Sequence, residues 1–441
     1  MSTETQRPLS PIERWYWILD QVSPLNAIAR VHIDGALDEA SVSDAADALQ
    51  ARHPFLRVAV VADADGTDPR FVPSSGRLEV RTITGDAQAW EREVDTVELA
   101  DGLDTVTGPL GRILHVDNGN GSHDLVLIAS HIVADGATML TLLRDLVVYA
   151  EATQRGEPPV IESLRSLEAP ETGLPKAFRG MLGAVRSMKV ALAEEVAIAR
   201  ARPKRLTAER DVEPTARRTR LIRRELDGAE LAQLTAACKK AGVSVHGALS
   251  AALALAVGDE LTPGQSGKVM IGSPVDFRDD LQPPVGRHEA GAYVCAVPSV
   301  LKYGPAEDLW AIAASTNAEL RKRVEKDHHF ALVSMLRLLT PKSLARSART
   351  LRMVDQRGPG NICLSNLGRY EFPESLGEWT MSGTQLVAGI SVSGFFVGVV
   401  NSSHGRLFWN FTYIEDIVSA ERANRIVDAT LHHVRSTLVG A

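Results

Sequence analysis

The chain of 441 residues is longer than a single hydrophobic core usually supports, so its length predicts two domains. Its 44% hydrophobic and 23% charged residues are ordinary globular values, and its net charge of −7 argues against a general nucleic-acid binder. The three cysteines lie far apart without a Cys-x-x-Cys pair, which argues against a disulfide scaffold or a cysteine zinc site and suits a reducing compartment.

No targeting or membrane-spanning segment is predicted. Residues 1–14 are polar and contain proline, without the basic and then apolar segments of a signal peptide. No uncharged apolar run is long enough to span a bilayer. We therefore expect a soluble, cytoplasmic monomer that has no transmembrane segment and binds no nucleic acid.

The first third of the chain predicts a sheet with covering helices. Residues 8–19 are typical of a helix opened by Ser10 with Pro11 at its first position. Within it, Trp15 and Trp17 either line a pocket or only dock the N-terminal segment. A second helix is expected over residues 37–52. Strands are expected over residues 29–33, 55–61, 78–83, 112–116 and 125–129, the last two forming a hairpin closed by Asn-Gly-Asn-Gly.

One strand–loop–helix segment carries candidate chemistry. Residues 125–129 form an unbroken apolar run that predicts a buried strand, and apolar residues recur at helical spacing from Met139 onward. His131, Asp135 and Gly136 lie between the two. From these residues alone, two interpretations stay open: a core histidine with a helix-capping aspartate, or a general base on a loop that Asp135 braces. A histidine suits the second role because its pKa lies near neutrality.

The middle of the chain has a different character. Residues 154–175 are rich in Pro, Glu and Ser and predict a connector. Residues 178–199 predict an amphipathic helix that either packs on the body of the protein or lies on a membrane surface. Residues 200–224 hold ten basic and three acidic residues, and form either a solvated linker or a docking face for an acidic partner.

The second half repeats the alternation of strands and helices. Strands are expected over residues 220–226, 269–275, 293–300, 361–367, 384–390, 395–401 and 407–413, and helices over residues 228–241, 244–257, 309–326, 329–339 and 419–438. The pattern predicts two similar α+β lobes. We expect residues 1–175 to form the lobe that carries the histidine motif, 176–219 a crossover helix and linker, and 220–441 the C-terminal lobe.

The sequence lacks the signatures of a nucleotide or metal site. No P-loop and no dinucleotide-binding Gly-x-Gly-x-x-Gly is present. The pairs His328-His329 and His432-His433 cannot each converge on one ion, because neighbouring side chains on a helix diverge by roughly 100°. We therefore expect neither a bound metal nor a bound cofactor.

Residues 130–136, Ser-His-Ile-Val-Ala-Asp-Gly, resemble the His-His-x-x-x-Asp-Gly signature of the superfamily that contains chloramphenicol acetyltransferase, nonribosomal-peptide condensation domains and polyketide-associated acyltransferases. Further matches follow in the family's order: residues 9–17, 272–275 with Arg278, 291–294, and 364–369. The resemblance spans nearly the whole chain. It is closest to the free-standing polyketide-associated type, which includes the phthiocerol dimycocerosyl transferases.

The resemblance implies two chloramphenicol-acetyltransferase-like lobes, each a mixed sheet with covering helices, and a tunnel between them. It implies an acyl donor carried as a thioester, on the phosphopantetheine of an acyl carrier protein or on coenzyme A, and a small-molecule acceptor bearing a hydroxyl. Three functions follow from this. They are ester formation on a polyketide, lipid or sugar hydroxyl, amide formation on an amine, and non-catalytic binding of a carrier protein.

The resemblance also implies residue roles. His131 matches the catalytic histidine, Asp135 and Gly136 the structural end of the motif, and Arg278 the usual partner of the aspartate. Ser130 replaces the first histidine, a position that does not transfer the proton in the family, so activity is expected to survive. Candidates for the oxyanion site or tunnel wall are Ser365, Asn366 and Ser130.

Basic residues provide candidates for carrier docking. Carrier proteins are typically acidic, whereas this chain is itself net negative, so docking needs a local positive face. The predicted docking residues are Arg217, Arg218 and Arg220, with a second cluster that includes Arg349 and Arg352.

Overall fold

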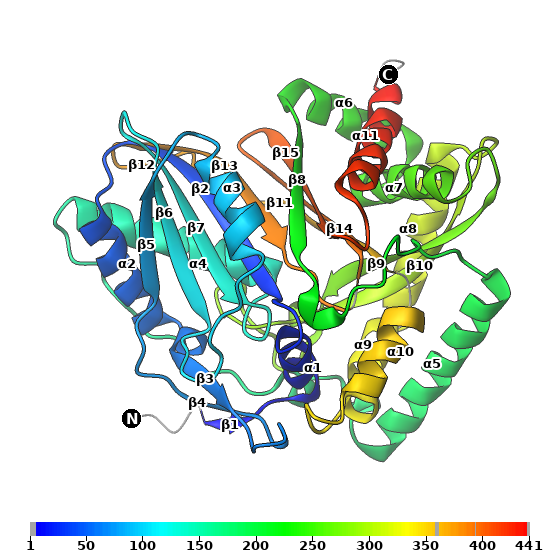
Figure 1. Cartoon of the computed structure of the whole chain (residues 1–441), viewed down its shortest axis with the longest axis horizontal. Coiled ribbons are helices and arrows are strands. Elements are labelled where there is room, and N and C mark those ends of the chain that lie inside the picture. Colours follow the sequence, from blue (N-terminus) through cyan, green and yellow to red (C-terminus); the bar gives the residue numbers. More distant parts are fainter. Residues whose placement is uncertain (1–5, 358–360, 393, 439–441) are drawn as a thin grey trace.

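Two six-stranded mixed sheets with covering helices make up most of the computed structural model, which describes residues 6–357, 361–392 and 394–438 (Figure 1). In spatial order the first sheet consists of β12 (Ser375–Leu376), β13 (Trp379–Ala388), β2 (Asn26–Asp34), β7 (Ser122–Ser130), β6 (Gly111–Asp117) and β5 (Glu79–Thr84). The second consists of β10 (Val294–Tyr303), β9 (Gly267–Asp276), β11 (Ile362–Arg369), β14 (Phe396–Ser403), β15 (Arg406–Ile414) and β8 (Thr219–Leu226). A small third sheet consists of β1 (Arg7–Pro8), β4 (Arg70–Pro73) and β3 (Val58–Val61).

Both large sheets combine parallel and antiparallel pairs. In the first, β5 runs parallel to β6, and the other neighbours are antiparallel. In the second, β11 runs parallel to both β9 and β14. The fold is therefore the predicted α+β arrangement of two mixed sheets.

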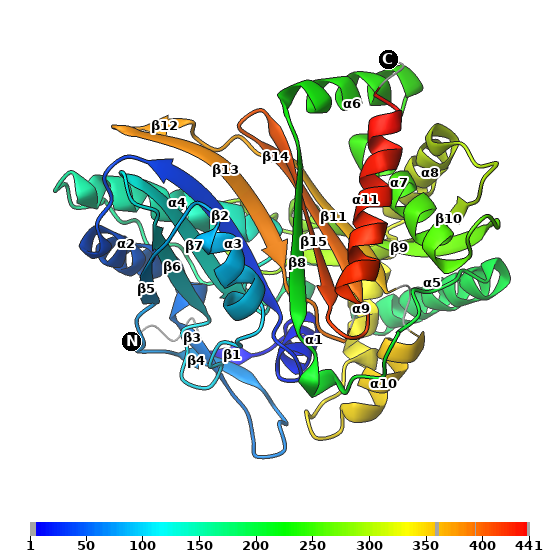
Figure 2. The ribbon, with the colours of Figure 1, turned by 45° about the horizontal axis from the view of Figure 1, so that its top comes forward.

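Helices cover the outer faces of the two sheets (Figures 1 and 2). Helices α2 and α4 lie over the first sheet, and α7, α8 and α11 lie over the second. Helices α5 and α9 pack against each other at the lower right in Figure 1, and α9 also contacts α1. The bounds are α1 (Pro11–Asp20), α2 (Glu39–Arg52), α3 (Ala89–Glu93), α4 (Gly136–Gln154), α5 (Gly180–Ala201), α6 (Gly228–Ala241), α7 (Val245–Leu261), α8 (Leu309–Glu325), α9 (His328–Leu339), α10 (Ala348–Arg357) and α11 (Ala420–Ser436).

Local capping sets the ends of several helices. Ser10 caps α1 in a reciprocal capping box with Glu13, and Pro11 occupies the first turn, as the sequence predicts. Asp227 caps α6 in the same way, and the helix ends at Gly242, whose φ of +67° a glycine adopts without strain. These side chains satisfy backbone groups that a helix end otherwise leaves unpaired.

Strand β13 joins the two halves of the chain. It comes from the C-terminal half but pairs with β2, at the edge of the N-terminal sheet (Figure 2). Asn401 and Ser403, on β14, both donate side-chain hydrogen bonds to the carbonyl of Thr384 on β13. The predicted C-terminal lobe of residues 220–441 therefore does not include β12 and β13, which belong to the first sheet. The lobe boundaries predicted for the rest of the chain stay predictions.

The hydrophobic core is continuous between the lobes. A single buried cluster contains Leu127 and Leu143 of the first lobe together with Phe277, Phe330 and Val399 of the second half. A separate cluster fills the space between the second sheet and α7, α8 and α11. Because the first cluster crosses between lobes, residues of both are held in fixed positions around the space between the sheets.

The lengths and compositions of the helices bear on membrane insertion. Within the described part of the chain, no single helix is long and apolar enough to cross a bilayer. Helices α6 and α7 meet that condition only as a pair, and the pair is bent by 97°.

Candidate active site

His131 follows directly after β7 and lines a cavity of about 680 Å³ between the two lobes. Its ring stacks on Tyr16 of α1, with ring centroids 4.4 Å apart and an interplanar angle of 15°. Its backbone N–H donates to the carbonyl of Leu25 at 3.0 Å. The ring Nδ1 atom is buried and has no hydrogen-bond partner among the described residues. Stacking on Tyr16 therefore fixes the plane of the imidazole.

The surroundings of His131 set its protonation state. Burial lowers the pKa of His131 below its ordinary value of 6.5, against the opposing attraction of the Asp135 carboxylate. The imidazole is therefore neutral at neutral pH. A neutral imidazole facing a cavity can accept a proton from a group bound there.

Asp135 is completely buried and is held from three sides. Its Oδ1 atom accepts hydrogen bonds from the Thr138 N–H at 2.9 Å and from Nη2 of Arg278 at 2.8 Å, and its Oδ2 atom accepts from the Tyr293 N–H at 2.8 Å. Burial favours the neutral acid, but Arg278 and these hydrogen bonds outweigh it, so the pKa of Asp135 lies below its ordinary value. Both carboxylate oxygens are occupied without contacting the His131 ring.

Arg278 extends this network into the second half of the chain. Its Nη2 atom also donates to Thr138 Oγ1 at 2.6 Å and to the carbonyl of Gly291 at 3.1 Å. Its Nη1 atom donates to Asp276 at 3.1 Å. The Asp135–Arg278 pair, which the resemblance implied, therefore connects the start of α4 to the segment that follows β9.

The N-terminus of α4 faces the same cavity through Gly136 and Ala137. A Cβ atom at Gly136 would lie 2.6 Å from Cδ2 of Leu367, so the glycine permits the close approach of α4 to β11. The N–H groups of Gly136 and Ala137 have no acceptor within the helix, unlike that of Thr138, which donates to Asp135, and they lie at the positive end of the helix dipole. They can donate to an oxyanion. This role was not predicted from the sequence, although Asp135 and Gly136 at the start of a helix were a signal for it.

The other predicted tunnel residues divide into two groups. Ser365 and Asn366 of β11 line the cavity. Ser130 does not line it, and the prediction that it lies in the tunnel is wrong. Its side chain is completely buried, and its Oγ atom accepts the backbone N–H of Ile132. Adjacent residues at the end of a strand point in opposite directions, so His131 and Ser130 do not face the same space.

The N-terminal helix contributes more than was predicted. Trp15 and Tyr16 line the cavity, whereas Trp17 lies in the core. The sequence did not single out Tyr16, because stacking between residues 16 and 131 depends on tertiary structure. Cys295 and Cys363 also line the cavity, and burial raises the pKa of each thiol to about 12. They are therefore protonated at neutral pH, which makes them poor nucleophiles.

The structure separates the predicted docking arginines. Arg217 is buried, and its Nη1 and Nη2 atoms bind both oxygens of Asp355 on α10 at 2.8 and 2.9 Å, so it cannot contact a partner. Arg220 is half-buried between Glu415 and Asp95. Exposed side chains that remain available are Arg218, Arg349 and Arg352. The number of basic residues in the segment showed its basic character, but it did not show which guanidinium groups are buried in the folded protein.

The cavity wall is mostly apolar and draws on distant elements. It includes Leu332, Met335 and Leu336 of α9 and Val397 and Val399 of β14. Such a wall fits an acyl chain better than a charged substrate. Among the described residues, no group of three or more His, Cys, Asp or Glu side chains that could hold a metal ion occurs.

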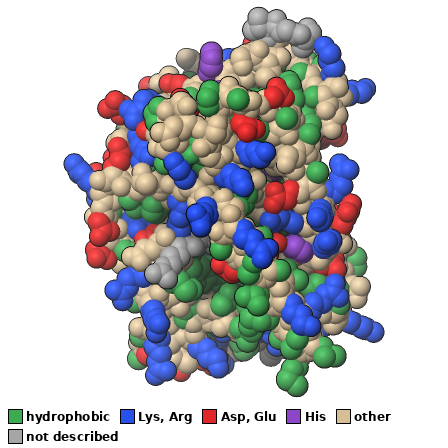
Figure 3. Space-filling view, turned by 90° about the vertical axis from the view of Figure 1, so that its right-hand side faces the viewer, with side chains coloured by type: hydrophobic (Ala, Val, Ile, Leu, Met, Phe, Trp, Pro, Cys, Tyr) green, Lys and Arg blue, Asp and Glu red, His purple; other side chains and the backbone are tan. Residues whose placement is uncertain are grey.

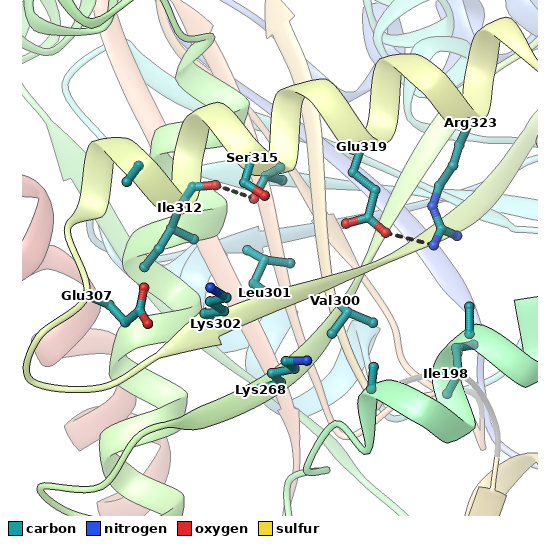
Figure 4. A pocket seen from close by; sticks show the side chains of 14 residues that line it. Ile198, Lys268, Val300, Leu301, Lys302, Glu307, Ile312, Ser315, Glu319 and Arg323 are labelled. Carbon is teal, nitrogen blue, oxygen red and sulfur yellow. Dashed lines mark hydrogen bonds and ion pairs between the residues drawn. The ribbon is translucent and has the colours of Figure 1, made fainter.

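A second pocket of about 390 Å³ lies between α5, α8 and the β9–β10 pair (Figure 4). It shares Ile198 and Arg323 with the larger cavity. Figure 4 shows Glu319 directed at Arg323 along α8, and the two side chains lie 2.7 Å apart. The lining of this second pocket includes basic residues, such as Lys268 and Lys302, and acidic ones, such as Glu319. His131 does not line it.

Comparison with family models matches both halves of the chain. Residues 3–166 match the condensation domain. Residues 215–397 match the family described as phthiocerol/phthiodiolone dimycocerosyl transferase C-terminus. The two matched segments follow one another and include both His131 and Arg278.

Curated relatives match a third of the chain. A linear gramicidin synthase from Brevibacillus parabrevis is 28% identical over 162 residues, which are 34% of this chain and 2% of that protein. Phosphinothricin tripeptide synthetase PhsC of Streptomyces viridochromogenes is 30% identical over 160 residues, which are 34% of this chain and 14% of that protein. The chain therefore spans only a small part of the length of these relatives.

Solved structures match over nearly the whole chain. The first condensation domain of the calcium-dependent antibiotic synthetase has a TM-score of 0.73 and 17% identity, covering 100% of this chain and 97% of that one. Polyketide synthase associated protein 5 from Mycobacterium tuberculosis has a TM-score of 0.67 and 22% identity, covering 98% of this chain and 97% of that one. At these identities the likeness shows a common fold.

Proposed function

Because this chain belongs to the condensation-domain superfamily, we propose that it is an acyltransferase that moves an acyl group from a thioester to an acceptor hydroxyl, with His131 as general base. The observation that carries the proposal is the half-buried imidazole of His131, whose lowered pKa keeps it neutral and which faces a largely apolar cavity between the lobes. The acceptor is a polyketide, a lipid or a sugar. The donor is carried on the phosphopantetheine of an acyl carrier protein or on coenzyme A, and no bound cofactor takes part.

Proton transfer is the task of His131. A hydroxyl is a poor nucleophile near neutral pH, so the imidazole removes its proton as the oxygen attacks the thioester carbonyl. A C–O bond forms, the C–S bond breaks, and the imidazolium returns the proton to the departing thiolate. Help of this kind is worth roughly 10²–10⁴-fold in rate. No acyl-enzyme is required, because both substrates meet in one cavity.

The tetrahedral intermediate needs donors for its oxyanion. The N–H groups of Gly136 and Ala137 lie at the start of α4 on the cavity wall, where the helix dipole favours negative charge. Ser365 and Asn366 line the same cavity and are further candidates. Asp135 and Arg278 then act as a brace that fixes the start of α4 rather than as reacting groups.

For a carrier-bound donor, we propose that the exposed arginines Arg218, Arg349 and Arg352 contribute to docking. Exposed charges of this kind mainly raise the rate of association, and salt screens them. Arg217 and Arg220 are excluded from this role, since both are paired within the protein.

Amide formation is a second candidate, because the curated relatives include peptide synthetases. Ester formation is favoured by the match of residues 215–397 to the dimycocerosyl transferase family. Competing alcohol and amine acceptors of equal chain length, offered with a range of acyl thioesters, decide between them by mass spectrometry of the products. Ester as the main product supports the proposal, and amide as the main product reassigns the acceptor.

A further inference from the structure

Helix α5 turns a row of large apolar side chains toward solvent. Met181 and Leu182 are 84% and 85% exposed, and Leu192 is 64% exposed. We call the whole row the α5 stripe; its members are Met181, Leu182, Val185, Met188, Leu192 and Val196. The spacing places them along one face of the helix. A contiguous exposed apolar surface of this kind marks an interaction site rather than ordinary surface variation.

The opposite face of α5 belongs to the active-site cavity. Val190, Ala191 and Ile198 line that cavity, and Gly183 and Ser187 are buried against the body of the protein. Helix α5 is therefore packed against the protein on one side, and the stripe is exposed on the other. One helix forms both the cavity wall and the exposed apolar surface.

The apolar surface continues onto the neighbouring helices. Leu338 and Leu339 at the end of α9 are 57% and 53% exposed, and Met353 of α10 is 51% exposed. Leu339 and Met353 also line the cavity. Figure 3 shows hydrophobic side chains gathered on the lower part of this face beside a hollow, with basic side chains around them. Leu339 and Met353 thus belong both to the exposed apolar surface and to the cavity wall.

Basic residues border this surface. Lys189 and Arg200 lie beside the stripe on α5, and Arg337 is exposed at the end of α9. Among the described residues, none of these three forms an ion pair with a carboxylate. Arg346 does not belong to this border, because the segment from Ser343 to Ala345 binds the backbone of Asp65 and Gly66 in the first lobe. Of the acidic residues on α5, Glu194 is paired inward with Arg323, and Glu195 is exposed. The border is therefore locally positive on a chain whose net charge is −7.

We propose that the α5 stripe and its basic border bind the surface of an anionic lipid bilayer, with α5 lying in the plane of the interface. An apolar stripe flanked by cations is the arrangement that places a helix at the boundary between headgroups and acyl chains. The anionic headgroups complement Lys189, Arg200 and Arg337. The docked helix remains attached to the folded protein through its cavity-facing side.

Docking in this orientation brings the bilayer to the part of the cavity formed by Leu339 and Met353. A lipid substrate then has a continuous apolar path from the membrane to the site of His131. This consequence rests on the proposed acyl transfer, whereas membrane binding itself does not. The two are therefore tested by separate measurements.

Binding is measured by co-sedimentation of the whole protein with vesicles of phosphatidylcholine alone and with vesicles containing about one-third phosphatidylglycerol. We expect sedimentation with the anionic vesicles and weaker binding as salt is raised, because salt screens the basic border. Failure to bind either kind of vesicle overturns the proposal.

Two sets of variants locate the surface. The double variant L182D/L192D should lower the partition coefficient by about tenfold or more, because two apolar side chains can no longer enter the interface. The variant V106D changes a valine in the segment before β6 that is as exposed as Leu192, and it should bind like the wild type. The variant K189E/R337E should lose affinity for anionic vesicles, whereas K240E, on α6, should keep it.

Activity and self-association complete the test. L182D/L192D should turn over a small water-soluble thioester and acceptor at the wild-type rate, which separates a binding defect from a folding or catalytic defect. If the wild type is a dimer that L182D/L192D converts to monomer, and vesicles are not bound, the stripe is an interface between copies of the chain and the proposal is wrong. Equal vesicle binding by L182D/L192D and the wild type also contradicts it.

Discussion

The ring of His131 must be neutral to act as a base, and burial lowers its pKa below 6.5. The protein should therefore remain active at pH 6.5, and its activity should fall only at lower pH. The midpoint of the acid limb of kcat/KM should accordingly lie below pH 6.5. The measurement is a pH–rate profile with a small thioester donor whose own ionisation is constant in this range. A midpoint above 6.5 contradicts the assignment of that limb to His131.

Asp135 and Arg278 illustrate the cost of an unpaired buried charge. Asp135→Ala should lower the free energy of unfolding by about 3–5 kcal/mol, because it removes the fully buried partner of Arg278 and leaves only the more exposed carboxylate of Asp276 beside that guanidinium among the described residues. His131→Ala removes no such pair and should change stability much less. The two melting temperatures, measured at pH 7, check this.

The same pair has a defined pH dependence. Since the pKa of Asp135 is lowered on folding, its stabilisation is present above the unfolded pKa and is lost as pH falls through the folded one. The difference in free energy of unfolding between the wild type and Asp135→Ala should thus become smaller only in strong acid. Equal melting temperatures of the two alanine variants at pH 7 would show that Asp135 is not a brace.

At the scale of elements, Arg217 and Arg218 are neighbours with different tasks. Arg217 attaches the segment before β8 to α10 through Asp355, whereas Arg218 is exposed. Arg217→Glu should therefore destabilise the protein and lower activity with every donor. Arg218→Glu should leave the melting temperature unchanged and raise the KM for a carrier-bound donor only. Thermal unfolding and KM for carrier-bound and small thioesters distinguish the two, and identical behaviour of both variants would contradict this division.

Elements defined by local signals could be predicted from the sequence. Residues 228–241 were predicted as a helix ending at Gly242, and α6 has these bounds. The structure shows that Asp227 caps its other end, so both ends are set by local signals. A strand was predicted over residues 384–390, which covers the second half of β13 (Trp379–Ala388). Its place in the first sheet was not predicted, since pairing with β2 depends on contacts far apart in sequence. Helix α10 was not predicted as an element.

The site shows the same limit. The resemblance predicted that His131 lies in the space between the lobes and that Asp135 pairs with Arg278, because a motif records residue types and order. It did not show that Ser130 points away from the cavity or that Tyr16 stacks on His131, since both depend on the direction of a side chain in the folded chain. The exposure of the α5 stripe was likewise open, because an amphipathic pattern does not tell which face is covered.

For the whole molecule, the two lobes depend on one another. A fragment of residues 1–219 lacks β13, so β2 loses a neighbour, and it lacks Arg278, so Asp135 loses its buried partner. We expect this fragment to be unfolded or aggregated, although it holds the histidine motif. Circular dichroism and thermal unfolding of the purified fragment test this. A cooperative transition near that of the full chain would show that the lobes fold independently.

The most direct test of the proposed acyl transfer is turnover by the wild type and His131→Ala, measured by mass spectrometry of acylated product from a thioester donor and an alcohol acceptor. We predict an ester whose rate of formation falls by at least about 10²-fold in His131→Ala, while the melting temperature stays close to that of the wild type. Full turnover by a folded His131→Ala protein, or no acylated product from the wild type with any donor and acceptor, would contradict the account.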